Sequence, residues 1–109
     1  DAIYKILQQK KPGDYVIATG KDCTIKEFVN KTAKIINLKI KWKGKGLNEI
    51  AVDENNKTVV CIDKKYFRPL EVDYLKGDAS KAKKYLKWKT NHTLDDLIKE
   101  MVQYELELP

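Results

Sequence analysis

Arg68 is the residue best suited to binding an anion, because it is the one arginine in a chain with 22 basic residues. A guanidinium is planar and forked, so it can bind two phosphate oxygens at once, whereas a lysine ammonium cannot. Pro69 favours an extended backbone at Arg68, which directs the arginine side chain. We therefore predict an anion-binding site in the segment Tyr66-Phe67-Arg68-Pro69-Leu70-Glu71-Val72.

Glu71 follows Arg68 by three residues and offers a second chemical function. Its carboxylate can accept hydrogen bonds from two adjacent hydroxyls, such as the cis-diol of a ribose. The same two residues could equally form a structural ion pair, which is a common role for arginine. Residue chemistry alone leaves both interpretations open.

Two other segments imitate catalytic or cofactor motifs. Tyr85 and Lys89 have the Tyr-x-x-x-Lys spacing, but that acid–base chemistry requires both side chains on one helical face. We expect the helix to end near Leu86, with Tyr85 continuing its apolar stripe. Gly44-Lys45-Gly46 begins like a dinucleotide-binding motif, yet Glu49 stands at the third glycine position. Both segments are therefore expected to be structural.

Chemical groups for catalysis are missing from the sequence. It contains no evident nucleophile–base pair, no phosphate-binding P-loop and no cluster of metal-ligand residues. Cys23 and Cys61 lie far apart and there is a single histidine, which argues against a zinc site or a disulfide scaffold. We predict no catalytic residue and no metal site, and we expect two reduced, half-buried thiols.

Composition limits the classes of function. A length of 109 residues suits one small domain, here taken as residues 1–109. The net charge of +6 comes from lysines scattered over every segment, whereas nucleic-acid surfaces usually draw on arginine. We expect no binding to nucleic acid. The sequence has no apolar run of transmembrane length and no signal peptide, so we expect no membrane association and a cytoplasmic location.

Four helices are expected from apolar periodicity and capping residues. The first covers residues 1–10. The second begins at a capping box formed by Thr24 and Glu27 and runs to residue 36. Asp78 is expected to cap a third helix with Ala82, Tyr85 and Leu86 facing inward, and Thr93 to cap the last. The apolar stripe of that last helix comprises Leu94, Leu97, Ile98, Met101 and Val102.

Strands are expected between these helices, which makes the fold class mixed α and β. Residues 15–18 form an apolar run typical of a strand buried on both faces. Residues 39–43 alternate polar and apolar, and residues 47–52 and 58–62 flank a polar loop as a hairpin. Residues 72–75 could add a short strand. Because a strand buried on both faces needs neighbours, and because the chain starts directly in a helix at Asp1, we expect a piece of a larger protein.

The motifs taken together resemble a known family. The block from Tyr66 to Val72 is followed by three shorter matches, and other matching stretches extend over nearly all 109 residues. They are similar to the C-terminal region of the extended short-chain dehydrogenase/reductases that act on nucleotide-sugars. Residues 15–20 and 42–46 favour the GDP-mannose 4,6-dehydratases over the UDP-sugar epimerases and decarboxylases. The three shorter matches are Leu75-Lys76-Gly77-Asp78, Lys81-Ala82 and Leu86-Lys87-Trp88-Lys89.

This resemblance implies a function for the two candidate residues. Arg68 would contact the diphosphate of GDP-mannose, and Glu71 would hold the ribose hydroxyls. The parent enzyme would eliminate water from GDP-mannose to give a 4-keto-6-deoxy sugar, with NADP carrying the hydride. The Rossmann core, with the NADP site and the catalytic residues, is missing from this chain, which would be the C-terminal substrate-binding part and inactive alone. We expect the parent to supply an N-terminal Rossmann domain and to be a homo-oligomer.

Three positions depart from the family pattern. Lys26 replaces a usual arginine, which puts any substrate contact there in doubt, while Lys87 replaces a common glycine and Thr90 a common proline. Two alternatives stay open: the same segment of an epimerase or decarboxylase that uses a UDP-sugar, and a free-standing basic module that binds nucleic acid.

Overall fold

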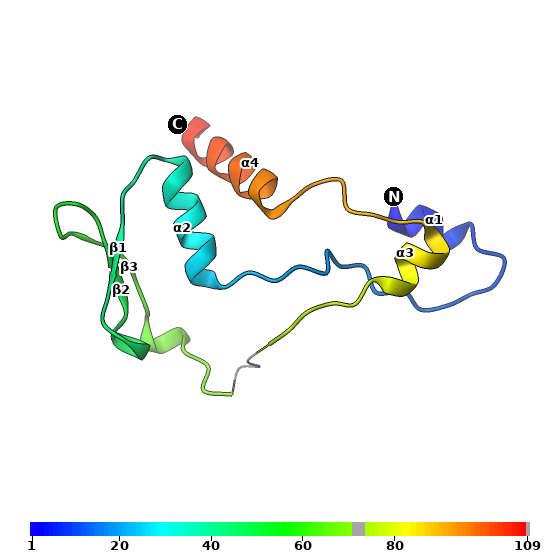
Figure 1. The fold of residues 1–109 in the computed structure, drawn as a ribbon, viewed down its shortest axis with the longest axis horizontal. Helices are drawn as coiled ribbons and strands as arrows, with labels where there is room; N and C mark the ends of the chain where they lie inside the picture. The colour runs from blue at the N-terminus through cyan, green and yellow to red at the C-terminus, as the bar shows by residue number, and fades with distance from the viewer. Residues whose placement is uncertain (71–73, 109) are drawn as a thin grey trace. The chain divides into compact units, whose positions relative to one another are not determined.

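The computed structural model describes residues 1–70 and 74–108 (Figure 1). The chain divides into two compact units, each described by itself below. Unit 1 comprises Asp1–Cys23 and Val72–Thr93, and unit 2 comprises Thr24–Glu71 and Leu94–Pro109. Helices and strands both occur, so the mixed α and β class predicted from the sequence is confirmed.

Unit 1 contains two short helices, α1 (Ala2–Leu7) and α3 (Ser80–Leu86). Its buried residues are Ala79, Ala82 and Leu86. The helix expected over residues 1–10 therefore forms but ends earlier, at Leu7. Tyr85, expected to face inward, is 58% exposed, so that part of the predicted stripe is wrong.

Residues 15–18 were predicted to form a strand buried on both faces, and this prediction is wrong for the chain as it stands. No described segment pairs with them, and Val16 is 54% exposed. A strand forms only when its backbone groups find a partner strand. Residues 74–77 approach this segment closely at Gly77 without forming a ladder. Tyr74 and Leu75 are not in a strand, and the rest of the predicted strand over 72–75 lies outside the described residues.

The N-terminal end of α3 differs from the prediction, whereas its C-terminal end matches the prediction. The residue at the N-cap position is Ala79, while Asp78 Oδ1 accepts hydrogen bonds from Ser80 N at 2.9 Å and Ser80 Oγ at 2.5 Å. The Ser80 hydroxyl, followed by the Ser80 N–H, lowers the pKa of the Asp78 carboxyl. Helix α3 ends at Leu86 as predicted, with Lys87 in the left-handed conformation (φ 53°).

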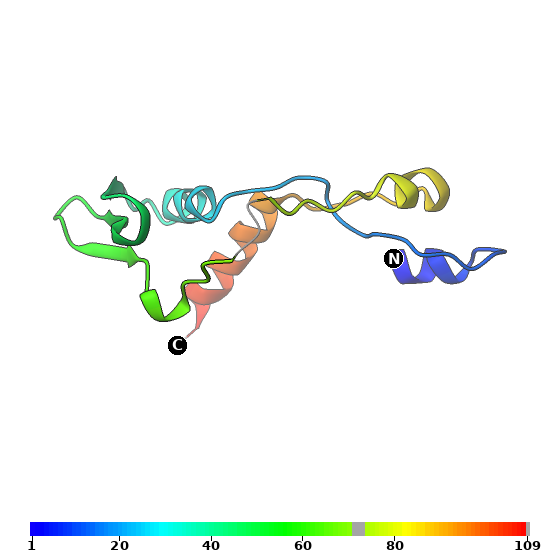
Figure 2. The ribbon, with the colours of Figure 1, turned by 90° about the horizontal axis from the view of Figure 1, so that it is seen from below.

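Unit 2 holds the two longest helices, α2 (Ile25–Ile35) and α4 (Leu94–Glu107). The capping box is confirmed: Thr24 Oγ1 accepts from Glu27 N at 3.1 Å, and Glu27 Oε2 accepts from Thr24 N at 2.8 Å. Helices α2 and α4 pack together and cross at an angle (Figures 1 and 2). The buried residues of these helices are Ala33 on α2 and Ile98 and Val102 on α4.

Three antiparallel strands form the sheet of unit 2 in the order β1 (Lys41–Lys43), β2 (Ile50–Val52) and β3 (Thr58–Cys61). The predicted hairpin is therefore confirmed with shorter strands. Its loop is held by Asp53 Oδ1, which accepts from the backbone N–H of Asn55 at 2.8 Å and of Lys57 at 2.9 Å. Two 3-10 turns flank the hairpin, η1 (Gly46–Asn48) and η2 (Lys64–Tyr66).

Helix α2 is attached to the sheet through Trp42 on β1. Trp42 Nε1 donates to Asn30 Oδ1 at 2.8 Å, and Lys26 Nζ lies 4.8 Å from the centroid of the Trp42 ring. Lys26 also pairs with Glu49 Oε1 at 2.5 Å. Lys26 thus has a local structural role. By its spacing, Ile25 is predicted to share one apolar face of this helix with Phe28, Val29, Ala33 and Ile36, but it is 84% exposed.

Candidate functional site

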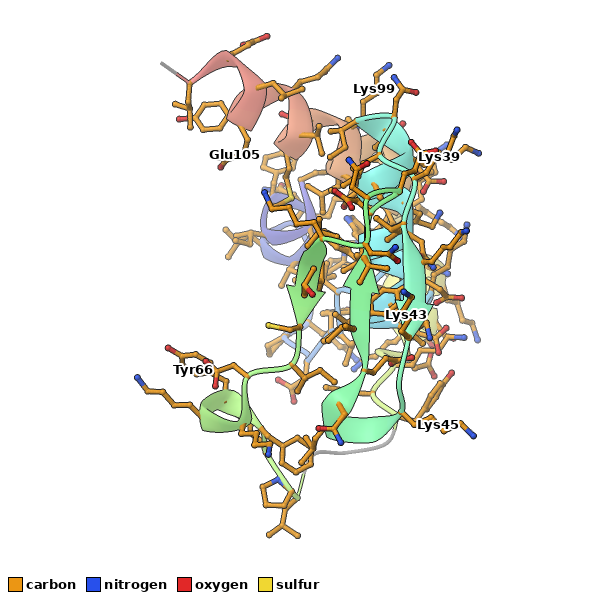
Figure 3. The ribbon with its side chains drawn as sticks, turned by 90° about the vertical axis from the view of Figure 1, so that its left-hand side faces the viewer. Lys39, Lys43, Lys45, Tyr66, Lys99 and Glu105 are labelled. Atoms are coloured by element: carbon orange, nitrogen blue, oxygen red, sulfur yellow. The ribbon has the colours of Figure 1, made fainter. Side chains whose placement is uncertain are left out.

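Arg68 lies in unit 2, two residues after the end of η2, in the segment that follows β3. It lines a hollow of about 450 Å³ that is formed entirely by one stretch of chain. Tyr66 lies at the η2 turn, on the β3 side of the sheet, while Lys43 and Lys45 lie on the β1 side (Figure 3). The hollow is lined by Cys61, Ile62, Asp63, Tyr66, Phe67 and Arg68.

The shape of this hollow is set by Asp63 and the η2 turn. Asp63 Oδ1 accepts from Lys65 N at 2.9 Å, and Asp63 O accepts from Tyr66 N at 3.1 Å. Aspartate is favoured here because its short side chain can satisfy a backbone donor two residues on. The turn then leads into an extended Phe67 (φ −69°, ψ 129°), which places Arg68 beyond the turn.

The guanidinium of Arg68 is exposed, and no carboxylate of the described residues lies within ion-pair distance of it. Glu71 lies outside the described residues, so both its role at a ribose and the alternative Arg68–Glu71 ion pair stay predictions. Within residues 1–70 and 74–108, the positive charge of Arg68 is therefore available to an anion. An exposed forked donor beside two aromatic rings suits a phosphate ester with an aromatic group.

The Tyr85–Lys89 pair and the Gly44-Lys45-Gly46 segment do not form the motifs that they resemble, as the sequence predicts. Helix α3 stops before Lys89, because Lys87 turns left-handed, so Tyr85 and Lys89 do not share a helical face. Gly44 adopts φ +81° between β1 and η1, and a β-carbon there would lie 2.3 Å from the carbonyl oxygen of Asn48. That glycine serves a tight turn, and a 3-10 turn follows it in place of the helix that a dinucleotide site needs.

Among the described residues, no three His, Cys, Asp or Glu side chains come together as a metal site would require. Cys23 and Cys61 are both exposed, which corrects the expectation of half-buried thiols. No helix within the described ranges has the length and apolar character needed to cross a bilayer.

The sequence predicts Arg68, Tyr66 and Phe67 as part of a site. It does not indicate that residues 61–63 line the same hollow. The sequence predicts Cys61 and Ile62 as the end of a hairpin strand and Cys61 as a reduced thiol, and it assigns no role to Asp63. One signal was present in the sequence: an aspartate directly before two lysines and an aromatic pair is typical of a side-chain-capped turn. Such a turn reverses the chain and brings residues 61–63 to face residues 66–68.

Comparisons with known proteins give matches over nearly the whole chain, and these matches point to one family. A family model described as GDP-mannose 4,6 dehydratase matches residues 1–101. The chain is 45% identical over 109 residues to a GDP-mannose 4,6 dehydratase of Drosophila melanogaster, covering 99% of this chain and 28% of that protein. It is 44% identical to the Homo sapiens protein of the same name, covering 99% of this chain and 29% of that protein. It is also 44% identical to GDP-mannose 4,6 dehydratase 1 of Arabidopsis thaliana, covering 99% of this chain and 26% of that protein. The chain therefore spans less than a third of the length of these relatives.

Proposed function

Because the chain belongs to the GDP-mannose 4,6 dehydratase family, we propose that it is the C-terminal, nucleotide-sugar-binding segment of such an enzyme. The observation that carries this proposal is the family match over residues 1–101, which includes the whole hollow around Arg68. The substrate would be GDP-mannose, and the complete enzyme would be a lyase that removes water from it. Each of the three relatives above is named for GDP-mannose, which favours a GDP-sugar over a UDP-sugar.

In this proposal Arg68 binds the diphosphate. Two N–H groups of one guanidinium can reach two phosphate oxygens, and such charge-assisted bonds are about twice as strong as neutral ones. No described carboxylate competes for the Arg68 guanidinium. Glu71 is proposed to hold the ribose hydroxyls from the same segment.

The cofactor of the family does not fit the residues described here. A dinucleotide site needs a glycine-rich turn between a strand and a helix, and the one comparable stretch, at Gly44, leads into η1. We therefore place the NADP site, the catalytic groups and the Rossmann domain in other parts of the longer protein. Homo-oligomeric assembly and a cytoplasmic location belong to the same proposal. This chain would orient the substrate and contribute no catalytic residue.

Exposed apolar side chains support a larger protein around both units. Unit 1 exposes Val16, Ile17 and Leu75, and in unit 2 Leu70 is 96% exposed. The groove between α2 and α4 is also apolar along its length, lined by residues such as Phe28, Met101 and Leu106. Apolar surface of this extent usually marks contact with further polypeptide.

The proposal is tested by incubating the full-length protein with GDP-mannose and following the keto-sugar product. We expect product from the full-length protein and none from residues 1–109 alone, even with added NADP. Product from GDP-mannose at no greater rate than from a UDP-sugar would contradict the proposal. A labelled oligonucleotide provides a second arm, because tight binding with a steep salt dependence would favour a nucleic-acid module instead.

A further inference from the structure

We propose that Asp63 recognises the guanine edge of the nucleotide, in the same hollow in which Arg68 binds the diphosphate. This inference rests on the proposed function, since it assigns a part of the same ligand. It gives the segment a base-specific residue in addition to a phosphate-binding residue.

The hollow has the size and walls that a nucleoside requires. Its volume of about 450 Å³ lies within the range of about 300–1,000 Å³ that is usual for small-molecule sites. Arg68 lines it together with Ile62, Tyr66 and Phe67, which supply apolar and aromatic side chains. Asp63 is the one acidic residue among those that line it.

Aromatic stacking is available mainly from Phe67. The ring of Tyr66 already has Lys65 Nζ over it, 5.4 Å from the ring centroid. Phe67 is 51% exposed, and no described cation lies over its ring. A half-exposed phenyl ring can stack on any nucleobase, so it contributes affinity, and selectivity must come from a polar group.

Asp63 is held in place by one oxygen and keeps acceptor capacity. Its Oδ1 accepts from Lys65 N, and no other hydrogen bond or ion pair to this carboxylate occurs among the described residues. A carboxylate beside an anion site is unfavourable for the phosphates themselves. Beyond capping the turn through Oδ1, this carboxylate would suit a ligand that also brings hydrogen-bond donors.

Guanine is the base that brings them. Its N1–H and N2–H₂ groups are adjacent donors on one edge, and an ionised carboxylate is an acceptor with two oxygens that can meet both. Uracil presents one N–H between two carbonyls, and adenine pairs its amino group with an acceptor nitrogen. A site built to accept two donors rejects bases that lack one of them, because a polar group is then left unpaired. Asp63 would thus select a GDP-sugar.

The test compares GDP with inosine diphosphate, which differs by the loss of the N2 amino group. Isothermal titration of the full-length protein should show a preference for GDP of about tenfold or more, the effect of one charge-assisted hydrogen bond. In Asp63→Asn the amide oxygen still accepts from Lys65 N, so the turn is kept, but the second position becomes a donor. We expect the GDP preference to fall to about one. Asp63→Ser, which can also cap the turn, should give the same loss.

Asp53→Asn is the matched control. Asp53 caps the hairpin loop in the same way, through its Oδ1, but does not line the hollow. The preference for GDP should be unchanged in this variant. If Asp63→Asn or Asp63→Ser retains the wild-type preference, or if both nucleotides weaken equally, Asp63 only caps the turn and the inference is wrong. The Arg68→Lys variant tests the proposed function separately. If it binds GDP and inosine diphosphate as tightly as the unmodified protein does, the proposed function fails.

Discussion

Gly77 passes so close to Ala18 that a β-carbon added to Gly77 would lie 2.4 Å from the Ala18 β-carbon. Such a separation is well inside van der Waals contact, so any side chain at this position must push the two segments apart. The contact joins the extended residues 15–18 to the segment that leads into α3.

The first prediction follows from this contact. In the full-length protein, Gly77→Ala should lower the opening free energy of α3 amides by about 1–3 kcal/mol, the usual cost of overpacking. Hydrogen exchange measures this locally. The double variant Gly77→Ala with Ala18→Gly removes the clashing methyl and should recover most of the loss. No recovery would show that the backbone of Gly77, and not its distance from Ala18, is what matters.

A second prediction concerns the left-handed Lys87 at the end of α3. A residue with a β-carbon is strained at φ 53°, and glycine is the preferred residue at this position. Lys87→Gly should therefore stabilise α3 by about 0.5–1 kcal/mol in the same exchange experiment. Lys84→Gly, inside the helix, should instead destabilise it by about 1 kcal/mol. Equal effects of the two substitutions would contradict the account of this helix end.

The third prediction is a pH dependence at Asp78. Its pKa is lowered mainly by the hydrogen bond from the Ser80 hydroxyl and to a smaller extent by the hydrogen bond from the Ser80 N–H. A carboxyl with a lower pKa in the folded state stabilises the fold above its unfolded pKa, and this contribution disappears as the pH falls through the folded value. Ser80→Ala should raise the Asp78 pKa towards its usual range, as followed by NMR titration. An unchanged Asp78 pKa would show that the hydroxyl does not act on it.

A fourth prediction tests the capping box of α2. Thr24→Ala removes the acceptor for Glu27 N and should destabilise α2 by about 1 kcal/mol. Thr24→Ser keeps the hydroxyl and should be nearly neutral. Exchange rates in the first turn of α2 distinguish the two variants, and equal rates in both would mean that the Thr24 hydroxyl does not stabilise this helix.

The features that were predicted correctly depend on neighbours in the sequence. The capping box at Thr24 and the hairpin around Asp53 involve residues two to four positions apart, so their residue types determine them. The strand at residues 15–18 depends on partner strands that no described segment supplies, and apolar character alone could not form it. Ile25 is exposed for a related reason, since the helix pattern identifies an apolar face without identifying what covers it.

At the candidate site, the sequence indicated the chemistry of Arg68 but not its surroundings. The single arginine and the aromatic pair were visible as residue types. That residues 61–63 face them depends on the η2 turn, which Asp63 stabilises through the Lys65 N–H. The sequence likewise could not predict that no described carboxylate forms an ion pair with Arg68, because an ion pair can form between residues that are distant in sequence.

The most direct test of the central claim is the affinity of the full-length protein for GDP-mannose when Arg68 is replaced by lysine. Arg68→Lys keeps the charge but loses the forked donor, so binding should weaken by about 1.5–3 kcal/mol in isothermal titration, roughly ten- to a hundredfold. Lys45→Gln, which removes a positive charge on the β1 side of the sheet (Figure 3), should leave the affinity unchanged. Unchanged affinity in Arg68→Lys, with the fold intact, would mean that Arg68 has only a structural role.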